Sequence, residues 1–119
     1  MKGKMSYSPA RYYDGLQAAQ EFYSNMASNP VLMGMQQERY RRMTLVARVL
    51  KDHLAINEDG SASISLETII GTARQEGISQ GLSDNNLKKV MREILRKGGH
   101  PRCAIKINQE NRQAYIYPR

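Results

Sequence analysis

The sequence predicts a mainly helical α+β fold in which a small β-hairpin follows several amphipathic helices. Three observations support this prediction: apolar residues recur at helical spacing along the first 97 residues, cap residues mark the starts of the helices, and two alternating runs enclose a polar turn after residue 100. With 119 residues, the chain has room for one modest core. We therefore expect an N-terminal helical extension over residues 1–37 and one compact domain over residues 38–119.

The first predicted helix begins at Ser8 and Pro9, which form an N-cap followed by proline at the first helical position, and it ends near Ala27. Gly15 lowers the helix propensity of this stretch. Apolar residues at spacings of four and three nevertheless place one stripe along the helix, formed by Tyr12, Leu16, Ala19, Tyr23 and Met26.

A second cap-and-proline pair at residues 29 and 30 allows a helix over residues 31–55, with Gly34 as a possible break. This helix is best defined over residues 38–54. Its main apolar face consists of Tyr40, Met43, Val46, Ala47, Leu50 and Leu54. Leu45 and Val49 lie on the opposite face and indicate a second neighbour, which is either the stripe of the first helix or another copy of the chain. In the second case, the interface of a homodimer or larger assembly consists of Tyr12, Leu16, Ala19, Tyr23, Leu45 and Val49.

A short alternating stretch over residues 61–65 follows a polar turn at residues 57–60 and predicts one edge strand. Ser65 then caps a helix whose apolar face consists of Leu66, Ile69, Ile70 and Ala73. Gly77 followed by Ile78 is typical of a glycine helix stop with an apolar contact.

The most clearly amphipathic helix spans residues 84–97, between a capping serine at position 83 and glycines at positions 98 and 99. Its apolar face consists of Leu87, Val90, Met91, Ile94 and Leu95. The opposite face carries Asn85, Lys88, Lys89, Arg92 and Arg96, with Glu93 toward one flank. After this helix, residues 100–107 and 113–119 alternate around a polar turn and predict the hairpin.

The chain carries 18 Lys and Arg against 11 Asp and Glu, a net charge of +7. This excess favours polyanionic partners, either nucleic acid or an acidic membrane surface. No run approaches the roughly 18 apolar residues of a membrane-spanning helix, and the N-terminus lacks the apolar block of a signal peptide. We therefore expect an intracellular protein, in the cytoplasm, nucleoid or nucleus, with no membrane partner.

The positive charge is concentrated toward the end of the sequence. Residues 83–119 contain nine basic and three acidic side chains, a net charge of +6, whereas residues 38–82 contain six of each. Amphipathic helices also carry Lys and Arg merely for solubility, but that role does not require the segregation seen in this chain.

In the order and spacing of its elements, the chain over residues 38–119 resembles the winged-helix superfamily. Its three helices would be ERYRRMTLVARVLKDHL, SLETIIGTARQEG and SDNNLKKVMREILRKGG, followed by the wing hairpin. The resemblance implies a non-enzymatic protein whose third helix, residues 84–97, enters the major groove of double-stranded DNA while the wing, residues 102–119, contacts the backbone. The seven residues 77–83 exceed the short turn of the compact helix-turn-helix.

Under this hypothesis the residues that contact DNA are Asn85, Lys88, Lys89, Arg92, Arg96, Arg102, Lys106 and Arg112. Arginine forks to guanine and asparagine pairs with adenine, so Asn85 and Arg92 are the candidate base readers and the others contact phosphates. Such a protein acts in transcription regulation, replication or genome maintenance. Two alternatives remain open: a winged-helix subunit that docks on other proteins in a larger assembly, and a ribonucleoprotein component that contacts RNA backbone.

The remaining aromatic and metal-binding residue types carry weaker signals. Tyr115 and Tyr117 either stack on bases or pack beneath the sheet, and we expect packing, which leaves no aromatic platform for a single strand. No enzyme is expected, because His53 and His100 lie in no recognisable catalytic motif. His100 and Cys103 supply only two metal ligands, so we expect a buried thiol, no metal and no cofactor.

Overall fold

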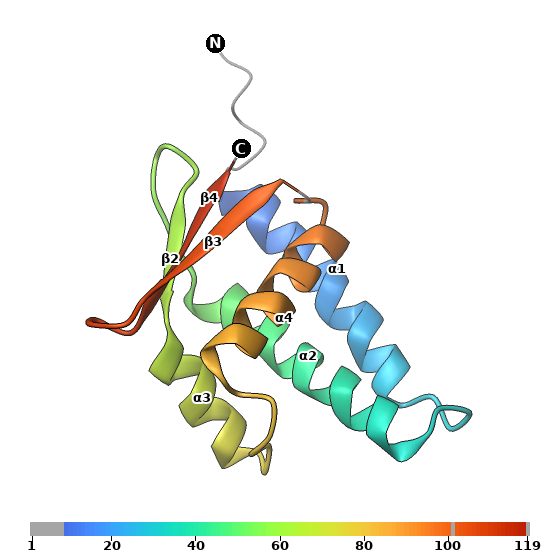
Figure 1. Cartoon of the computed structure of the whole chain (residues 1–119). Coiled ribbons are helices and arrows are strands. Elements are labelled where there is room, and N and C mark those ends of the chain that lie inside the picture. Colours follow the sequence, from blue (N-terminus) through green and yellow to red (C-terminus); the bar gives the residue numbers. More distant parts are fainter. Residues whose placement is uncertain (1–8, 101, 119) are drawn as a thin grey trace.

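The computed structural model describes residues 9–100 and 102–118 of the chain (Figure 1). The α+β class is confirmed, with four helices and one antiparallel sheet of four strands in the described residues. In chain order the elements are α1 (Pro9–Ala27), α2 (Gly34–His53), β1 (Ala55–Ile56), β2 (Ala62–Ser65), α3 (Leu66–Gln75), α4 (Asp84–Lys97), β3 (Cys103–Asn108) and β4 (Gln113–Pro118). The predicted cap Ser8 and the basic residue Arg119 lie outside the described residues. Within those residues, every helix is too short or too polar to cross a membrane.

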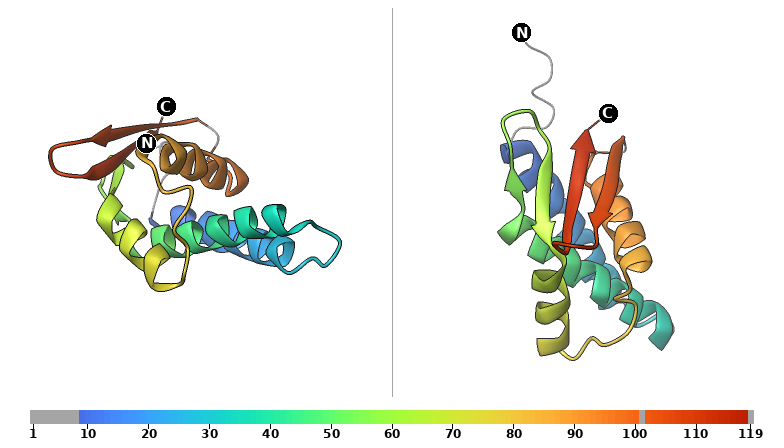
Figure 2. Two further views of the ribbon diagram at one scale, coloured as in Figure 1. Left: turned by 60° about the horizontal axis from the view of Figure 1, so that its bottom comes forward. Right: turned by 60° about the vertical axis from the view of Figure 1, so that its left-hand side comes forward.

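α1 and α2 lie side by side, and α4 packs across both of them (Figures 1 and 2). The six residues expected at an interface are at most 2% exposed within this single chain: Tyr12, Leu16, Ala19, Tyr23, Leu45 and Val49. They belong to one hydrophobic core that also includes residues of α3, α4 and the sheet. Intramolecular packing therefore accounts for both apolar strips, and these side chains offer no exposed surface to a second copy. The residues of α1 share the core of the segment after residue 37.

α1 approaches the end of α4 through a contact between two glycines. A Cβ atom added to Gly15 would lie 2.2 Å from the carbonyl oxygen of Gly98, and one added to Gly98 would lie 2.7 Å from the carbonyl oxygen of Gly15. Real Cβ atoms do not approach backbone oxygens this closely, so only glycine fits on either side. The glycine that weakens the sequence signal for the first helix is therefore required by the packing of that helix.

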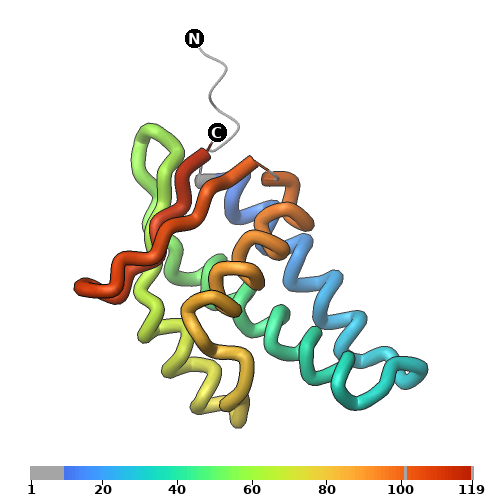
Figure 3. Tube along the Cα trace, in the orientation of Figure 1, coloured from blue at the N-terminus to red at the C-terminus, as the bar shows by residue number. Residues whose placement is uncertain are grey.

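The sheet has the strand order β1-β2-β4-β3, and every neighbouring pair is antiparallel. The predicted hairpin over residues 100–107 and 113–119 is confirmed as β3 and β4, joined by a turn at residues 109–112 that projects from one end of the molecule (Figure 3). The prediction that residues 61–65 form an edge strand is wrong. β2 is internal, because β1 pairs with it on one side and β4 on the other.

The two faces of the sheet differ in composition. The core face is formed by buried side chains from three strands: Ala62, Ile64, Ile105, Ala114 and Ile116. Because side chains alternate along a strand, Tyr115 and Tyr117 lie on the opposite face, where Tyr117 is 43% exposed. The prediction that both tyrosines pack beneath the sheet is therefore wrong, since Ala114 and Ile116 occupy the core positions of β4.

The helix ends follow the sequence signals with two exceptions. The cap-and-proline pair at residues 29 and 30 does not start a helix, because the Oδ1 of Asn29 accepts a hydrogen bond from the Val31 amide at 2.9 Å within a turn. α2 begins at Gly34, so this glycine starts the helix and does not break it. The hydroxyl oxygen of Ser83 accepts a hydrogen bond from the Asn86 amide at 3.2 Å, which confirms the cap of α4. Gly77 has a φ of 81°, and the Ile78 amide donates to the Ala73 carbonyl at 2.9 Å, which confirms the glycine stop of α3. The prediction for Ser65 is wrong in one respect: it stands at the cap position of α3, but its side chain makes no cap hydrogen bond.

Candidate nucleic-acid interface

The position of α4 is fixed by its apolar face. Leu87, Val90, Met91, Ile94 and Leu95 are all buried, as the periodicity predicts. α4 packs against α1, α2 and β3, so its remaining side faces solvent (Figure 2). A helix held on three sides presents its outer side chains from a rigid backbone, which suits an element that must fit a partner of fixed shape.

The outer side of α4 carries the residues that the sequence assigned to it. We call these five residues the α4 strip: Asn85, Lys88, Lys89, Arg92 and Arg96. All are exposed except Lys88, which is half-buried. Glu93 is exposed at the flank, and its backbone carbonyl accepts a hydrogen bond from the Tyr23 hydroxyl at 3.4 Å. Burial, and then the negative charge of Glu93, raise the pKa of Tyr23 to about 12, so this hydroxyl remains a donor.

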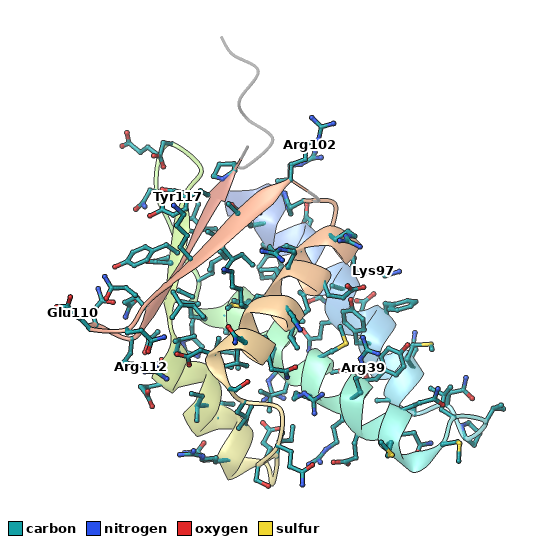
Figure 4. The ribbon with its side chains drawn as sticks, viewed as in Figure 1. Arg39, Lys97, Arg102, Glu110, Arg112 and Tyr117 are labelled. Atoms are coloured by element: carbon teal, nitrogen blue, oxygen red, sulfur yellow. The ribbon has the colours of Figure 1, made fainter. Side chains whose placement is uncertain are left out.

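A hollow lies on each side of the α4 strip, and basic side chains from other elements line both. On one side, Arg39 and Arg42 of α2 face Lys89, Arg92 and Arg96. The sequence alone did not indicate Arg39 and Arg42, because both belong to a different helix. Figure 4 shows Arg39 on the α2 side of α4 and Arg102 near the start of β3.

The second hollow lies between α4 and β3. It is lined by Arg102, which precedes β3, by Lys106 of β3, and by Lys88 and Arg92 of α4. The structure therefore brings the two predicted wing residues next to the predicted helix residues. Arg92 lines both hollows and occupies the centre of the combined surface.

The basic residues around α4 differ in their pairing from three arginines elsewhere in the chain. Elsewhere, salt bridges join Arg41 to Glu38, Arg48 to Glu76, and Arg112 to both Glu67 and Asp84. Within the described residues, no salt bridge involves the eight basic residues around α4: Arg39, Arg42, Lys88, Lys89, Arg92, Arg96, Arg102 and Lys106. Glu93 is the one carboxylate among the residues that line the two hollows. We call the surface formed by these eight basic residues the α4 surface. Its positive charge is largely uncompensated.

Arg112 does not belong with the other predicted DNA contacts. It ends the β3–β4 turn with a φ of 56°, its Nε lies 3.1 Å from Oε2 of Glu67, and its Nη1 lies 2.8 Å from Oδ2 of Asp84. The hydrogen bond from Arg112 is the largest cause of a lowered pKa at Asp84, and the two carboxylates raise the pKa of Arg112 in return. This guanidinium thus joins the hairpin turn to the first turns of α3 and α4.

We expect Arg112→Gln to lower the melting temperature while changing affinity for duplex DNA less than two-fold. Its charge is already balanced by Asp84 and Glu67, and exposed ion pairs of this kind contribute only modestly to stability. Lys106→Gln is the matched control, because it removes the same charge from an exposed position of β3 that forms no salt bridge in the described part of the chain. Lys106→Gln should weaken DNA binding and leave the melting temperature unchanged. The opposite ranking of the two variants in anisotropy titrations would show that the wing turn contacts DNA.

The fold and this surface define an α+β protein with one helix that carries an unpaired basic face. In comparisons with known proteins, no family model, no curated protein and no solved structure matches the chain. Within the described residues, no group of three or more histidine, cysteine or acidic side chains could hold a metal ion. Cys103 is buried in β3, as the sequence predicts, and His100 is buried beside Tyr12, with ring centroids 4.8 Å apart.

Proposed function

We propose that this chain is a non-enzymatic, winged-helix protein that binds double-stranded DNA through α4. The observation that carries the proposal is the uncompensated charge of the α4 surface, where eight basic side chains from three parts of the chain make no salt bridge with any described residue. A phosphate backbone supplies the missing negative charge and releases its counterions on binding. From α2 onward the elements run helix, two short strands, helix, helix and hairpin. Apart from the two-residue strand β1, this is the order that the winged-helix resemblance implies.

The dimensions of α4 suit the major groove. The helix has 14 residues, which corresponds to a length of about 21 Å, and a helix fits the roughly 12 Å width of the groove. With α4 in the groove, Asn85 and Arg92 face base edges. The arginines of α2 and the basic residues of β3 then lie toward the two phosphate backbones that border the groove. Such a protein acts in transcription regulation, replication or genome maintenance without chemistry of its own.

The test is a fluorescence anisotropy titration of the protein against a labelled random duplex between about 50 and 200 mM salt. Each neutralised phosphate contributes about −0.9 to the slope of log affinity against log salt concentration. We expect a slope of about −5, which corresponds to roughly six phosphates neutralised by the eight basic side chains. Absence of binding at the lowest salt concentration would overturn the proposal and favour a protein-interaction subunit.

A further inference from the structure

The outer face of the sheet carries an aromatic pair that the α4 surface does not use. The helices pack on the other face, so the outer face is open (Figure 2). Tyr115 and Tyr117 lie next to each other on it, with ring centroids 6.5 Å apart and an interplanar angle of 23°. The hydroxyl oxygen of Tyr115 accepts a hydrogen bond from Nδ2 of Asn111 at 2.9 Å, which restrains that ring. Tyr117 is exposed and stands clear of the core (Figure 4).

The residues around the two rings leave the rings accessible and make their surroundings positively charged. The strand register places Lys106 on one side of Tyr115 and Ser63 on the other, and it places Ala104 beside Tyr117. Small neighbours such as serine and alanine do not cover an aromatic ring. By strand alternation, the outward positions of the four strands hold no carboxylate: Ala55, Ser63, Ser65, Ala104, Lys106, Asn108, Gln113, Tyr115 and Tyr117.

This face is continuous with the α4 surface around the edge of the sheet. β3 is the edge strand beside α4, and Arg102 and Lys106 line the hollow that also contains Lys88 and Arg92. Lys106 therefore borders both the tyrosines and the α4 strip. A polyanion that extends from α4 toward the tyrosine rings therefore passes Arg102 and Lys106, which form no salt bridge in the described residues.

We propose that Tyr115, Tyr117, Lys106 and Arg102 form a second nucleic-acid site that binds a single strand. The bases stack on the two tyrosine rings, and the two cations contact phosphates. Stacking on aromatic side chains is tolerant of sequence because every base has a π-face, and it combines with a basic groove in proteins that bind single strands. This site does not depend on the proposed binding of duplex DNA, because its aromatic residues lie outside the α4 surface.

The test compares the full chain with the Tyr115→Leu, Tyr117→Leu double variant in titrations with labelled oligo(dT) of about twelve nucleotides and with a duplex. We expect the double variant to lose about 100-fold in affinity for oligo(dT), or roughly ten-fold per ring, while duplex affinity stays within two-fold. Tyr13→Leu is the matched control, because it removes a tyrosine that is 51% exposed. Tyr13 belongs to α1, which lies on the helix side of the sheet and not on its outer face. Tyr13→Leu should change neither affinity.

A second readout does not rely on the stability of the double variant. Tyr117→Phe keeps the ring, so it should retain affinity for oligo(dT), whereas Tyr117→Leu alone should not. The chain contains no tryptophan, so tyrosine emission can be followed directly and should be quenched by oligo(dT) in the unmodified protein. Equal oligo(dT) affinity in all variants, or no binding of oligo(dT) to the unmodified protein, would overturn the single-strand site. The duplex titration reports separately on the α4 proposal.

Discussion

Gly15→Ala should destabilise the protein by about 3 kcal/mol, the upper part of the usual range for overpacking a close contact. The added Cβ would lie 2.2 Å from a backbone oxygen of Gly98, so neither a rotamer change nor a flexible side chain can relieve the clash. α1 or the end of α4 must move instead, which separates the buried stripe of α1 from its neighbours. Urea unfolding followed by circular dichroism measures this loss. Gly98→Ala, with a 2.7 Å approach to Gly15, should be destabilising as well.

Gly71→Ala is the matched control for this prediction. Gly71 is an exposed position inside α3, and a Cβ atom there meets nothing within 4 Å. The alanine should therefore stabilise the protein by about 0.5–1 kcal/mol through helix propensity alone. If Gly15→Ala proved as stable as the unmodified protein, α1 would not dock against the end of α4 as described.

The Arg92→Ala, Arg96→Ala double variant should bind duplex DNA about 100-fold more weakly, since a good arginine contact to a base or phosphate is worth roughly 1–3 kcal/mol. Both side chains are exposed and make no salt bridge within the described residues, so the melting temperature should not fall. The salt slope separates their roles: two lost phosphate contacts flatten it by about 1.8, whereas one base contact and one phosphate contact flatten it by about 0.9.

Arg74→Ala provides the control for the loss of arginine itself. Arg74 is exposed in the last turn of α3 and makes no salt bridge within the described residues. Its substitution should change duplex affinity less than two-fold. If the double variant bound duplex DNA as tightly as the Arg74 variant, α4 would not be the element that contacts DNA.

Local patterns predicted the helices and the hairpin well, because a 3.6-residue period identifies both the helix and its buried face. The five apolar residues of α4 are the clearest case. The stops after α3 and α4 depend on positive φ angles at Gly77 and Gly99, which glycine adopts readily. β1 escaped prediction because its two residues, Ala55 and Ile56, carry no period. The internal position of β2 depends on pairing with β4, some fifty residues later, which no local pattern contains.

The candidate surface shows the same division between local and distant information. Amphipathicity alone places the α4 strip on the outer side of its helix. Arg39 and Arg42 belong to the candidate surface only because α2 packs beside α4. Arg112 is excluded from that surface because it pairs with Glu67, 45 residues away in sequence. The exposure of the two tyrosines could be predicted only with the register of the hairpin. Lys106 is paired with Tyr115, and paired residues lie on the same face of the sheet, so a solvent-facing Lys106 places Tyr115 on the solvent face as well.

The place of β4 in the sheet limits when this protein can fold during its own synthesis. β2 and β3 are not neighbours, and both pair with β4. Until residues 113–118 have been made, β3 has no partner among the described strands, and β2 has only the two residues of β1. So short a hairpin does not persist in water. The growing chain must therefore carry its apolar helix faces incompletely covered until β4 is available. Chaperone binding or aggregation would compete with folding during that interval.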